Sequence, residues 1–243
     1  MKRLSLVVAM AALLTACSTY TTPGAGVSLG AITEGDSDIA ATMARQPAMT
    51  FPARLAIVRV AATGYRSGSN DSVGIGAFAI VTTRDIETDE SFTRLAAMPR
   101  VAAIAPVSRL LVSSNLGSTR DLRSAAAQLR ADAILIYTID TRFRTESAQL
   151  GPLQTIALGF LPSEKAVVSA TCAFIIVDVR TGFVYGTGET TATEDQRSNI
   201  WGSSSAIETA RLKAEQRAFE DGLGEVEKLW ASILLEHGTP RPS

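Results

Sequence analysis

A run of apolar residues in the middle of the chain constrains its fold more than any other feature. The sequence Ala-Ile-Leu-Ile-Tyr at residues 133–137 is apolar at every position. Successive side chains of a strand point to opposite faces, so a strand formed here is apolar on both faces and lies inside a covered sheet. Residues 133–143 are therefore predicted to form a central strand, with Asp140 and Arg142 on one face where it leaves the core.

The neighbouring segments predict the rest of the domain. Short apolar runs with few breakers predict strands over residues 53–61, 77–83 and 101–107. Apolar residues at helical spacing predict helices over residues 85–98 and 118–130, and a Gly/Ser/Asn-rich loop is predicted over residues 63–76. Strands that alternate with helices predict a single α/β or α+β domain with a mixed sheet over residues 53–243.

Residues 166–180 and 183–193 are predicted to form a β-hairpin. Thr181 and Gly182 make the connection, and Gly182 supplies the positive φ that a tight turn needs. In that register two pairs are opposed, Val177 with Gly186 and Ile175 with Gly188. Two glycines on one face of a strand indicate that another element approaches closely there.

The last segment predicts a long amphipathic helix over about residues 205–237. Ser205 and Glu208 fit a capping box at its start. Its apolar stripe consists of Ile207, Ala210, Ala214, Ala218, Leu223, Val226, Trp230 and Ile233. The stripe is expected to pack on the sheet, although a narrow Ala-rich stripe also suits a helix that binds a partner. Gly222 and Gly224 are expected to bend or break the helix, each costing about 1 kcal/mol relative to Ala.

The supply of reactive side chains excludes most metal and catalytic chemistry. The 243-residue chain has one histidine, His237, and two cysteines, Cys17 and Cys172. Metal sites and nucleophile–base pairs use imidazole or thiolate more than other groups, and neither a Walker loop nor a dinucleotide fingerprint occurs. With 23 basic and 24 acidic residues, the chain has no general attraction for nucleic acid. We therefore expect no enzymatic activity, no metal and no cofactor.

The N-terminus has the order of an export signal. Lys2 and Arg3 precede a run of apolar or small residues over 4–14, which is about 16 Å long as a helix and too short to span the roughly 30 Å bilayer core. The following Leu14-Thr15-Ala16-Cys17 resembles the lipobox of bacterial lipoproteins. The resemblance implies that residues 1–16 are removed as a signal peptide and that Cys17 carries covalent lipid. Residues 17–52, rich in Ser, Thr, Gly, Ala and Pro, are then a lipidated flexible tether.

Lipidation of Cys17 has consequences for the rest of the chain. Cys172 remains as the only thiol, so an intrachain disulfide is excluded, and its place in an alternating apolar run predicts a buried, inert side chain. The mature chain has 21 basic and 24 acidic residues, a net charge of -3, so acyl chains rather than charge must hold it at a membrane. Ser18 and Thr19 resemble the outer-membrane sorting pattern, which implies the periplasmic face of the outer membrane.

A second resemblance lies inside the domain. The segment 122–137, Leu-Arg-Ser-Ala-Ala-Ala-Gln-Leu-Arg-Ala-Asp-Ala-Ile-Leu-Ile-Tyr, is similar to the helix-then-strand unit of envelope lipoproteins such as the curli-secretion lipoprotein and the activators of penicillin-binding proteins. This resemblance implies a small mixed-sheet domain used for protein association without catalysis. A protein partner or a homo-oligomer follows from the same resemblance.

Two further features are candidate surfaces. A charged patch is expected from Asp140, Arg142, Asp178, Arg180 and Glu189, with the last three on one face of the hairpin. Carboxylates beside an arginine can perform acid–base chemistry, but on a sheet they more often form cross-strand ion pairs. The apolar residues of 149–162 predict either an exposed apolar surface or a segment packed on the core.

The sequence as a whole predicts a membrane-anchored envelope lipoprotein that acts as a non-catalytic binding or assembly module. Two alternatives remain open. One is an oligomeric secretion accessory like the curli-secretion lipoprotein, and the other is a hydrolase that uses the acidic patch.

Overall fold

The structure, a computed structural model, describes residue 26 and residues 39–67, 70–147, 164–198 and 203–238. Cys17, the lipobox and the apolar segment 149–162 lie outside these described residues. The helices are α3 (Ile39–Met43), α4 (Asp89–Ala96), η2 (Arg109–Leu111), α5 (Thr119–Gln128) and α7 (Ser203–His237). The strands are β1 (Ala53–Ala61), β2 (Arg66–Ser67), β3 (Asn70–Val73), β4 (Ile75–Gly76), β5 (Ala79–Val81), β6 (Val101–Pro106), β7 (Asn115–Leu116), β8 (Ala133–Ser147), β9 (Glu164–Asp178) and β10 (Val184–Ser198).

A mixed sheet forms the centre of the domain, and this confirms the predicted α/β class. The strand order is β10-β9-β8-β1-β5-β3-β2, and β6 pairs with β1 beside β5. Strand β1 runs parallel to both β6 and β8, while the β8–β9–β10 pairings are antiparallel. The predicted central strand is confirmed, because β8 lies between β1 and β9. Strands β2, β3 and β4 form within the segment 63–76, which was predicted as a loop.

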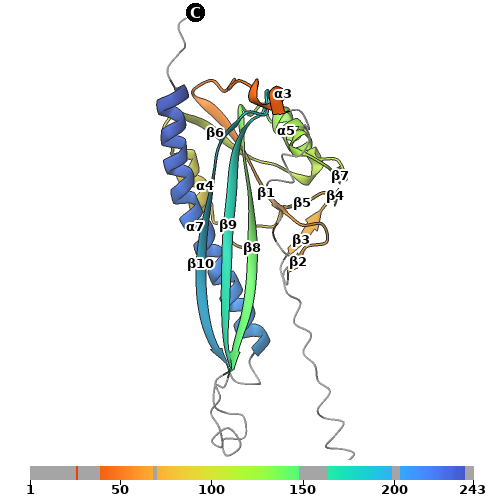
Figure 1. Cartoon of the computed structure of the whole chain (residues 1–243), viewed down its shortest axis with the longest axis vertical. Coiled ribbons are helices and arrows are strands. Elements are labelled where there is room, and N and C mark those ends of the chain that lie inside the picture. The colour runs from red at the N-terminus through yellow and green to blue at the C-terminus, as the bar shows by residue number, and fades with distance from the viewer. Residues whose placement is uncertain (1–25, 27–38, 68–69, 148–163, 199–202, 239–243) are drawn as a thin grey trace, which may run out of the picture.

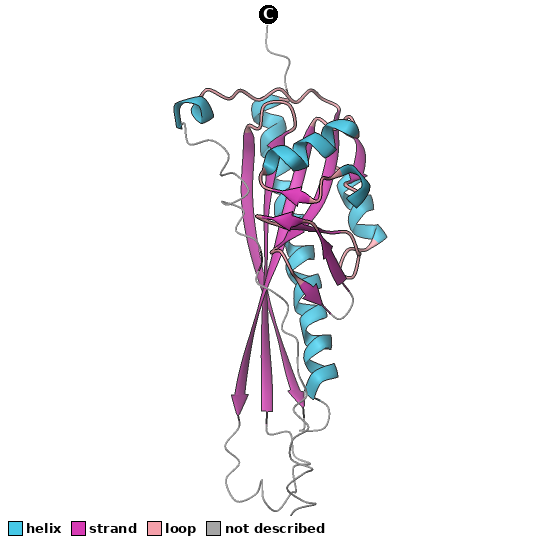
Figure 2. Cartoon of the chain, turned by 90° about the vertical axis from the view of Figure 1, so that its right-hand side faces the viewer, coloured by secondary structure: helices cyan, strands magenta, loops and turns pink. Residues whose placement is uncertain are grey.

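Helices cover both faces of the sheet at one end of the molecule. On one face, α4 and α7 pack on apolar side chains of β1, β8 and β9. On the other face, α5 contributes Leu122, Ala125 and Ala126 to a second core with β1, β5 and β8. Strands β8, β9 and β10 continue beyond the other strands, with α7 alongside them (Figure 2). The far half of these strands is therefore covered by α7 on one face only.

Helix α7 packs on the sheet with its predicted apolar stripe. From Ala210 to Ile233, all seven stripe residues are at most 2% exposed, so the stripe is covered by the domain itself. The expected break at Gly222 and Gly224 is wrong, because α7 is continuous from Ser203 to His237. The helix also begins before the predicted capping box, and the Glu208 carboxylate bonds Arg211 instead.

The turn between β9 and β10 is longer than the two-residue connection that the sequence predicted. Strand β9 ends at Asp178 and β10 begins at Val184, so the connection is longer than Thr181 and Gly182 alone, although Gly182 does have a positive φ of 72°. The Asp178 carboxylate accepts hydrogen bonds from the backbone N–H groups of Arg180 (2.9 Å) and Thr181 (3.0 Å), which stabilises the wider turn.

The register of the hairpin differs from the prediction as well. A register shift between Val184 and Gly186 places Gly186 opposite Ile176 and Gly188 opposite Phe174. The expected close approach is present at Gly186, where an added Cβ would lie 2.5 Å from Leu229 of α7. At Gly188 the approaching group is the ring of Phe174, which belongs to the neighbouring strand.

Candidate functional site

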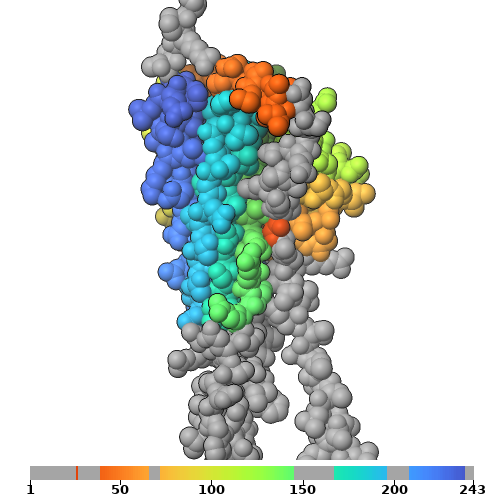
Figure 3. All heavy atoms as spheres, viewed as in Figure 1, coloured from red at the N-terminus to blue at the C-terminus, as the bar shows by residue number. Residues whose placement is uncertain are grey.

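One face of the three long strands is polar and open. It is the face opposite α7, and its side chains come from alternate residues of β8, β9 and β10. Small hydroxyl groups dominate it, and we call it the threonine face: Thr138, Ser169, Thr171, Thr187, Thr191 and Thr193. The hydroxyl groups of Thr171 and Thr191 lie 2.9 Å apart, and Thr193 donates to Ser169 across 3.4 Å. Figure 3 looks onto this side of the molecule, where atoms of β8, β9 and β10 lie exposed next to one another.

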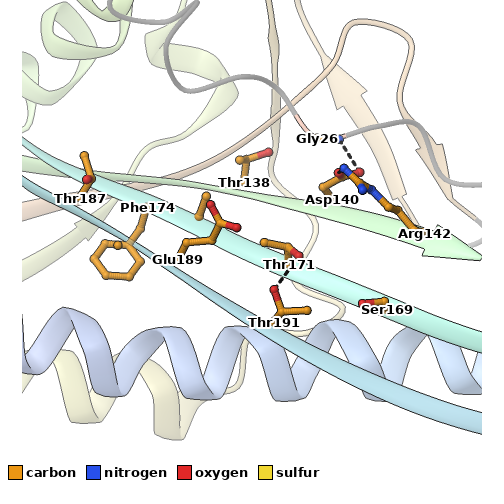
Figure 4. A pocket seen from close by; sticks show the side chains of 12 residues that line it. Gly26, Thr138, Asp140, Arg142, Ser169, Thr171, Phe174, Thr187, Glu189 and Thr191 are labelled. Carbon is orange, nitrogen blue, oxygen red and sulfur yellow. Dashed lines mark hydrogen bonds and ion pairs between the residues drawn. The ribbon is translucent and has the colours of Figure 1, made fainter.

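The threonine face forms the floor of an open groove of about 850 Å³. The groove is lined by hydroxyl side chains together with Asp140, Arg142, Glu189 and the backbone of Gly26 (Figure 4). Arg142 Nη2 lies 3.4 Å from Asp140 Oδ2, and the Arg142 side chain is largely exposed. An ion pair this exposed contributes little stability, about 1 kcal/mol at most.

The five residues of the predicted charged patch do not lie together. Asp140, Arg142 and Glu189 are on the threonine face. Asp178 is opposite Ala133, seven residues along β8 from Asp140, which is about 23 Å at the rise of a strand. The side chains of Asp178 and Glu189 are on opposite faces of the sheet. Glu189 pairs with Ala173 of β9 and shares its face, and Asp178 is an odd number of residues from Ala173 on the same strand, so its side chain points to the other face.

Asp178 and Arg180 organise the other end of the strands. The fully buried Asp178 carboxylate accepts hydrogen bonds from the backbone N–H of Ala48 (2.7 Å) and the hydroxyl of Tyr185 (2.8 Å). Arg180 donates to the Ala48 carbonyl (3.3 Å) and lies 3.5 Å from Asp132. These two residues therefore hold the segment before β1 against the hairpin.

Sequence reasoning missed a buried charge cluster on the α7 side of the sheet. It consists of Arg59, Asp85, Glu87, Glu208, Arg211 and Glu215. Arg59 of β1 lies 2.8 Å from Asp85, 3.5 Å from Glu87 and 3.8 Å from Glu215. Arg211 of α7 lies 2.6 Å from both Glu208 and Glu215. The cluster thus connects α7 to β1 and to the segment before α4.

Burial and ion pairing act in opposite directions on the two arginines. Burial alone lowers the pKa of Arg59, but Glu87 and Asp85 outweigh it, and the pKa is raised above its usual value. Burial likewise opposes the charge of Arg211, but the hydrogen bonds that Arg211 donates to Glu208 and Glu215 raise its pKa above the usual value. Both arginines therefore stay charged inside the protein.

Two hydroxyl groups complete the cluster. Tyr137 donates a 2.6 Å hydrogen bond to Glu87 Oε1, and Thr141 donates a 2.7 Å bond to Glu215 Oε1. Burial, followed by the charge of Glu87, raises the pKa of Tyr137 well above its usual value. The adjoining cavity, lined by Arg59, Glu87 and Tyr137, is only about 40 Å³. Ligand sites usually occupy some 300–1,000 Å³, so this cluster has no room for an organic substrate.

The remaining reactive groups offer little chemistry. Cys172 is 2% exposed, and burial raises its pKa to about 12, so the prediction of a buried thiol is confirmed. Among the residues that the structure describes, no group of three or more acidic, histidine or cysteine side chains could hold a metal ion. Nor does any helix in those ranges have the length and apolar character to cross a bilayer.

Comparison with known proteins gives structural similarities only. No family model matches the chain, and no curated protein matches it. A Xanthomonas campestris protein of the DUF330 family is 13% identical, with 78% of this chain and 90% of that chain covered and a TM-score of 0.39. A candidate lipoprotein from Caulobacter crescentus is 15% identical, with 48% and 77% covered and a TM-score of 0.29. A dodecameric PelC variant from Paraburkholderia phytofirmans is 16% identical, with 70% and 90% covered and a TM-score of 0.26.

Proposed function

We propose that the chain is a lipid-anchored protein of the cell envelope whose domain binds a protein partner without catalysis. The N-terminal signal and Cys17 support the anchor. The observation that carries the binding role is the threonine face, an open groove of about 850 Å³ over three long strands. Its hydroxyl groups donate and accept hydrogen bonds, so they can satisfy the polar groups of a partner surface.

The placement of charged groups supports binding over catalysis. An acid–base enzyme holds its carboxylates in a concave site that shields them from water. Asp140 and Glu189 line a groove that is open to water: Glu189 is exposed, and Asp140 is paired with the largely exposed Arg142. The carboxylates that are shielded, Glu87 and Glu215, belong to a cluster without space for a substrate.

Crosslinking in living cells tests this proposal. A photoreactive amino acid replaces Thr187 or Thr191 on the threonine face, and in a control it replaces Lys228 on the exposed side of α7. We expect both threonine-face positions to give the same protein adduct and the α7 position to give none. Absence of an adduct at both face positions, or the same adduct from all three, would contradict the proposal.

A second candidate function is an oligomeric secretion accessory, and one observation favours it. Strand β10 is fifteen residues long and is the last strand on its side of the sheet. An edge strand of this length offers backbone N–H and C=O groups that can pair with another chain. Light scattering on detergent-solubilised protein tests this candidate: a ring-sized particle is expected, and a monomer would exclude it.

A further inference from the structure

The charges of the threonine face are separated into two rows. Among the side chains that the structure describes, β8 presents the exposed Arg142 and Arg144, together with Asp140, which is paired with Arg142. The charged side chains of β10 on this face are both acidic and exposed, Glu189 and Asp195. Between the two rows, β9 contributes small, uncharged side chains: Val167, Ser169, Thr171 and Ala173. The face therefore has a basic margin and an acidic margin.

The pairing of the strands places these residues in rungs across the face. Arg142, Ser169 and Thr193 lie opposite one another in one rung. In the next rung outward, Arg144 and Asp195 lie on opposite margins of the same level. Neighbouring strands are about 4.8 Å apart, so a base on one margin is about 10 Å from an acid on the other.

A second copy of this face complements the first when a two-fold axis along β9 relates the two. Such an axis exchanges the margins, so the β8 row of each copy lies opposite the β10 row of the other. Arg144 of each copy then faces Asp195 of the other, and Ser169 lies on the axis, opposite the same residue of the second copy. Aligned sheets pack about 10 Å apart, within the combined reach of an arginine and an aspartate side chain.

The other two-fold packing of these faces is unfavourable. An axis that ran across the strands would place β10 of one copy on β10 of the other. The described charged side chains of that row on this face are Glu189 and Asp195, so acidic side chains would lie opposite acidic side chains. Like charges opposed in this way are destabilising. Charge therefore favours the axis along β9.

We infer that the partner of the threonine face is a second copy of this chain, docked face to face about a two-fold axis along β9. The inference rests on the proposed function, because it names the partner that this face binds. Gly26, whose N–H donates to Asp140, lies on the β8 margin one rung from Ser169 (Figure 4). The rung of Arg144 and Asp195 lies on the other side of Ser169, and both of its charged residues are exposed.

The size of the contact determines where the dimer forms. The rungs from Thr138 to Arg144 are about 20 Å long and about 14 Å wide, at most about 300 Å² per copy. Stable interfaces bury about 800 Å² per partner, so two domains in dilute solution would associate weakly. Chains that the proposed lipid anchor holds on one membrane have a higher effective concentration for each other. The dimer is therefore expected on membranes.

Disulfide trapping of the full-length chain in membranes tests the inference. Ser169→Cys places a thiol on the axis, where identical residues of the two copies meet, and it leaves the charges of the face unchanged. Ser124→Cys on the exposed side of α5 is the matched control, and the buried Cys172 does not compete. With a mild oxidant, we expect the Ser169→Cys chain to form linked pairs at least tenfold faster than the Ser124→Cys chain. Equal rates would overturn the inference.

Charge reversal in the Ser169→Cys chain tests how the margins pair. Arg144→Glu alone, or Asp195→Arg alone, opposes like charges at both symmetric contacts, and each should slow trapping by about fivefold. When the two variants carry different tags and share one membrane, their mixed pair again opposes unlike charges at both contacts. This mixed pair should form at the rate of the chain without reversal. A mixed pair that formed no faster than the pairs of either variant alone would exclude the proposed pairing.

The crosslinking experiment separates failure of this inference from failure of the proposed function. An adduct between two copies of the chain from Thr191 supports both. An adduct with a different protein leaves the proposed function in place and overturns the inference. No adduct from either Thr187 or Thr191 contradicts both.

Discussion

Arg211 is fully buried, and the cost of burying its charge is offset by contacts with two carboxylates. Removing both an arginine and a carboxylate from water costs several kcal/mol per group, and close pairing offsets that cost. Arg211 meets this requirement with 2.6 Å contacts to Glu208 and Glu215. Glu215 in turn accepts a hydrogen bond from Thr141 of β8, so the ion pair fixes the position of α7 over the sheet.

Replacing Arg211 should therefore be costly. Arg211→Met leaves Glu215 buried without its closest cation, and we expect the free energy of unfolding to fall by roughly 3–5 kcal/mol. Urea unfolding followed by the fluorescence of buried Trp230 measures it. Arg217→Met, which removes the exposed partner of Glu194 on the same helix, is the control and should leave the urea midpoint nearly unchanged. Similar midpoints for the two variants would mean that the buried cluster does not stabilise the fold.

Cys172 gives a prediction about reactivity. Burial disfavours the thiolate and raises its pKa to about 12, so at about pH 8 the thiolate fraction is on the order of 10⁻⁴. Native protein should remain unmodified by iodoacetamide at Cys172, and protein unfolded in urea should be alkylated there. Peptide mass spectrometry distinguishes the two states. Rapid alkylation of the native protein would show that Cys172 is accessible and would contradict its placement beneath α7.

The same shift predicts the direction of the pH dependence of stability. The unfolded chain ionises its thiol near pH 9, whereas the folded chain does so near 12. Between these values the unfolded state binds fewer protons, so stability should fall as the pH rises from about 9 toward 12. In Cys172→Ala this decrease should be shallower. The urea midpoints of the unmodified chain and of Cys172→Ala, determined at a series of pH values, measure this difference. If the midpoints of both proteins fell equally with pH, the raised pKa of Cys172 would be contradicted.

Among the elements, α7 contains two glycines, Gly222 and Gly224, whose surroundings differ. An added Cβ at Gly222 would lie 3.2 Å from the sulfur of Cys172 and 3.4 Å from the hydroxyl oxygen of Thr190. At Gly224, nothing lies within 4 Å of that position. The first glycine lets the helix approach β9 and β10, where Thr190 donates to the Ala218 carbonyl, and the second faces open space.

Substitution of these two glycines should therefore have different effects. Gly224→Ala gains helix propensity without a clash, and we expect it to stabilise the protein by about 0.5–1 kcal/mol. Gly222→Ala should gain less, because its methyl group meets Cys172, and Gly222→Val should be destabilising. Urea unfolding of the three variants measures the differences. Equal stabilisation by both alanine substitutions would contradict close packing at Gly222.

The elements that sequence predicts well are those with a strong apolar pattern. Strand β1 has the predicted bounds, β8 is central, and the stripe of α7 is buried. The register of β10 was missed because it depends on the turn around Asp178 and on a local shift at Gly186, which the apolar pattern does not report. A tight two-residue turn would have been the default for Thr181 and Gly182.

The buried charge cluster was missed for a different reason. Its members come from four separate parts of the sequence, represented by Arg59, Glu87, Tyr137 and Arg211, and no local spacing connects them. One signal was available: Arg59 lies within a strand that is otherwise almost wholly apolar and buried. A buried arginine requires a buried carboxylate as its partner. Only the tertiary structure determines which carboxylate that is.

At the scale of the whole molecule, the domain is elongated and its two ends are built differently. One end carries α3, α5 and the β9–β10 turn, and the other consists of the far halves of β8, β9, β10 and α7 (Figure 1). The proposed function uses the open face of the second part, which only α7 supports. The rest of the sheet has helices on both faces, whereas this part has a helix on one face only. The uncovered face therefore carries polar side chains. On β8 the change falls between Ile136, which is buried in the second core, and Asp140, which lines the groove.

Attachment of this molecule to a membrane should depend on Cys17 alone. The net charge of -3 predicted for the chain after removal of residues 1–16 would give no attraction to anionic headgroups, and each buried methylene of an acyl chain contributes about 0.8 kcal/mol. Cys17→Ala should therefore move the protein from the membrane fraction to the soluble fraction, as measured by fractionation after a salt wash. Cys172→Ala is the matched control and should remain in the membrane, because that thiol is buried in the domain. If Cys17→Ala stayed with the membranes, the anchor would have to lie elsewhere in the chain.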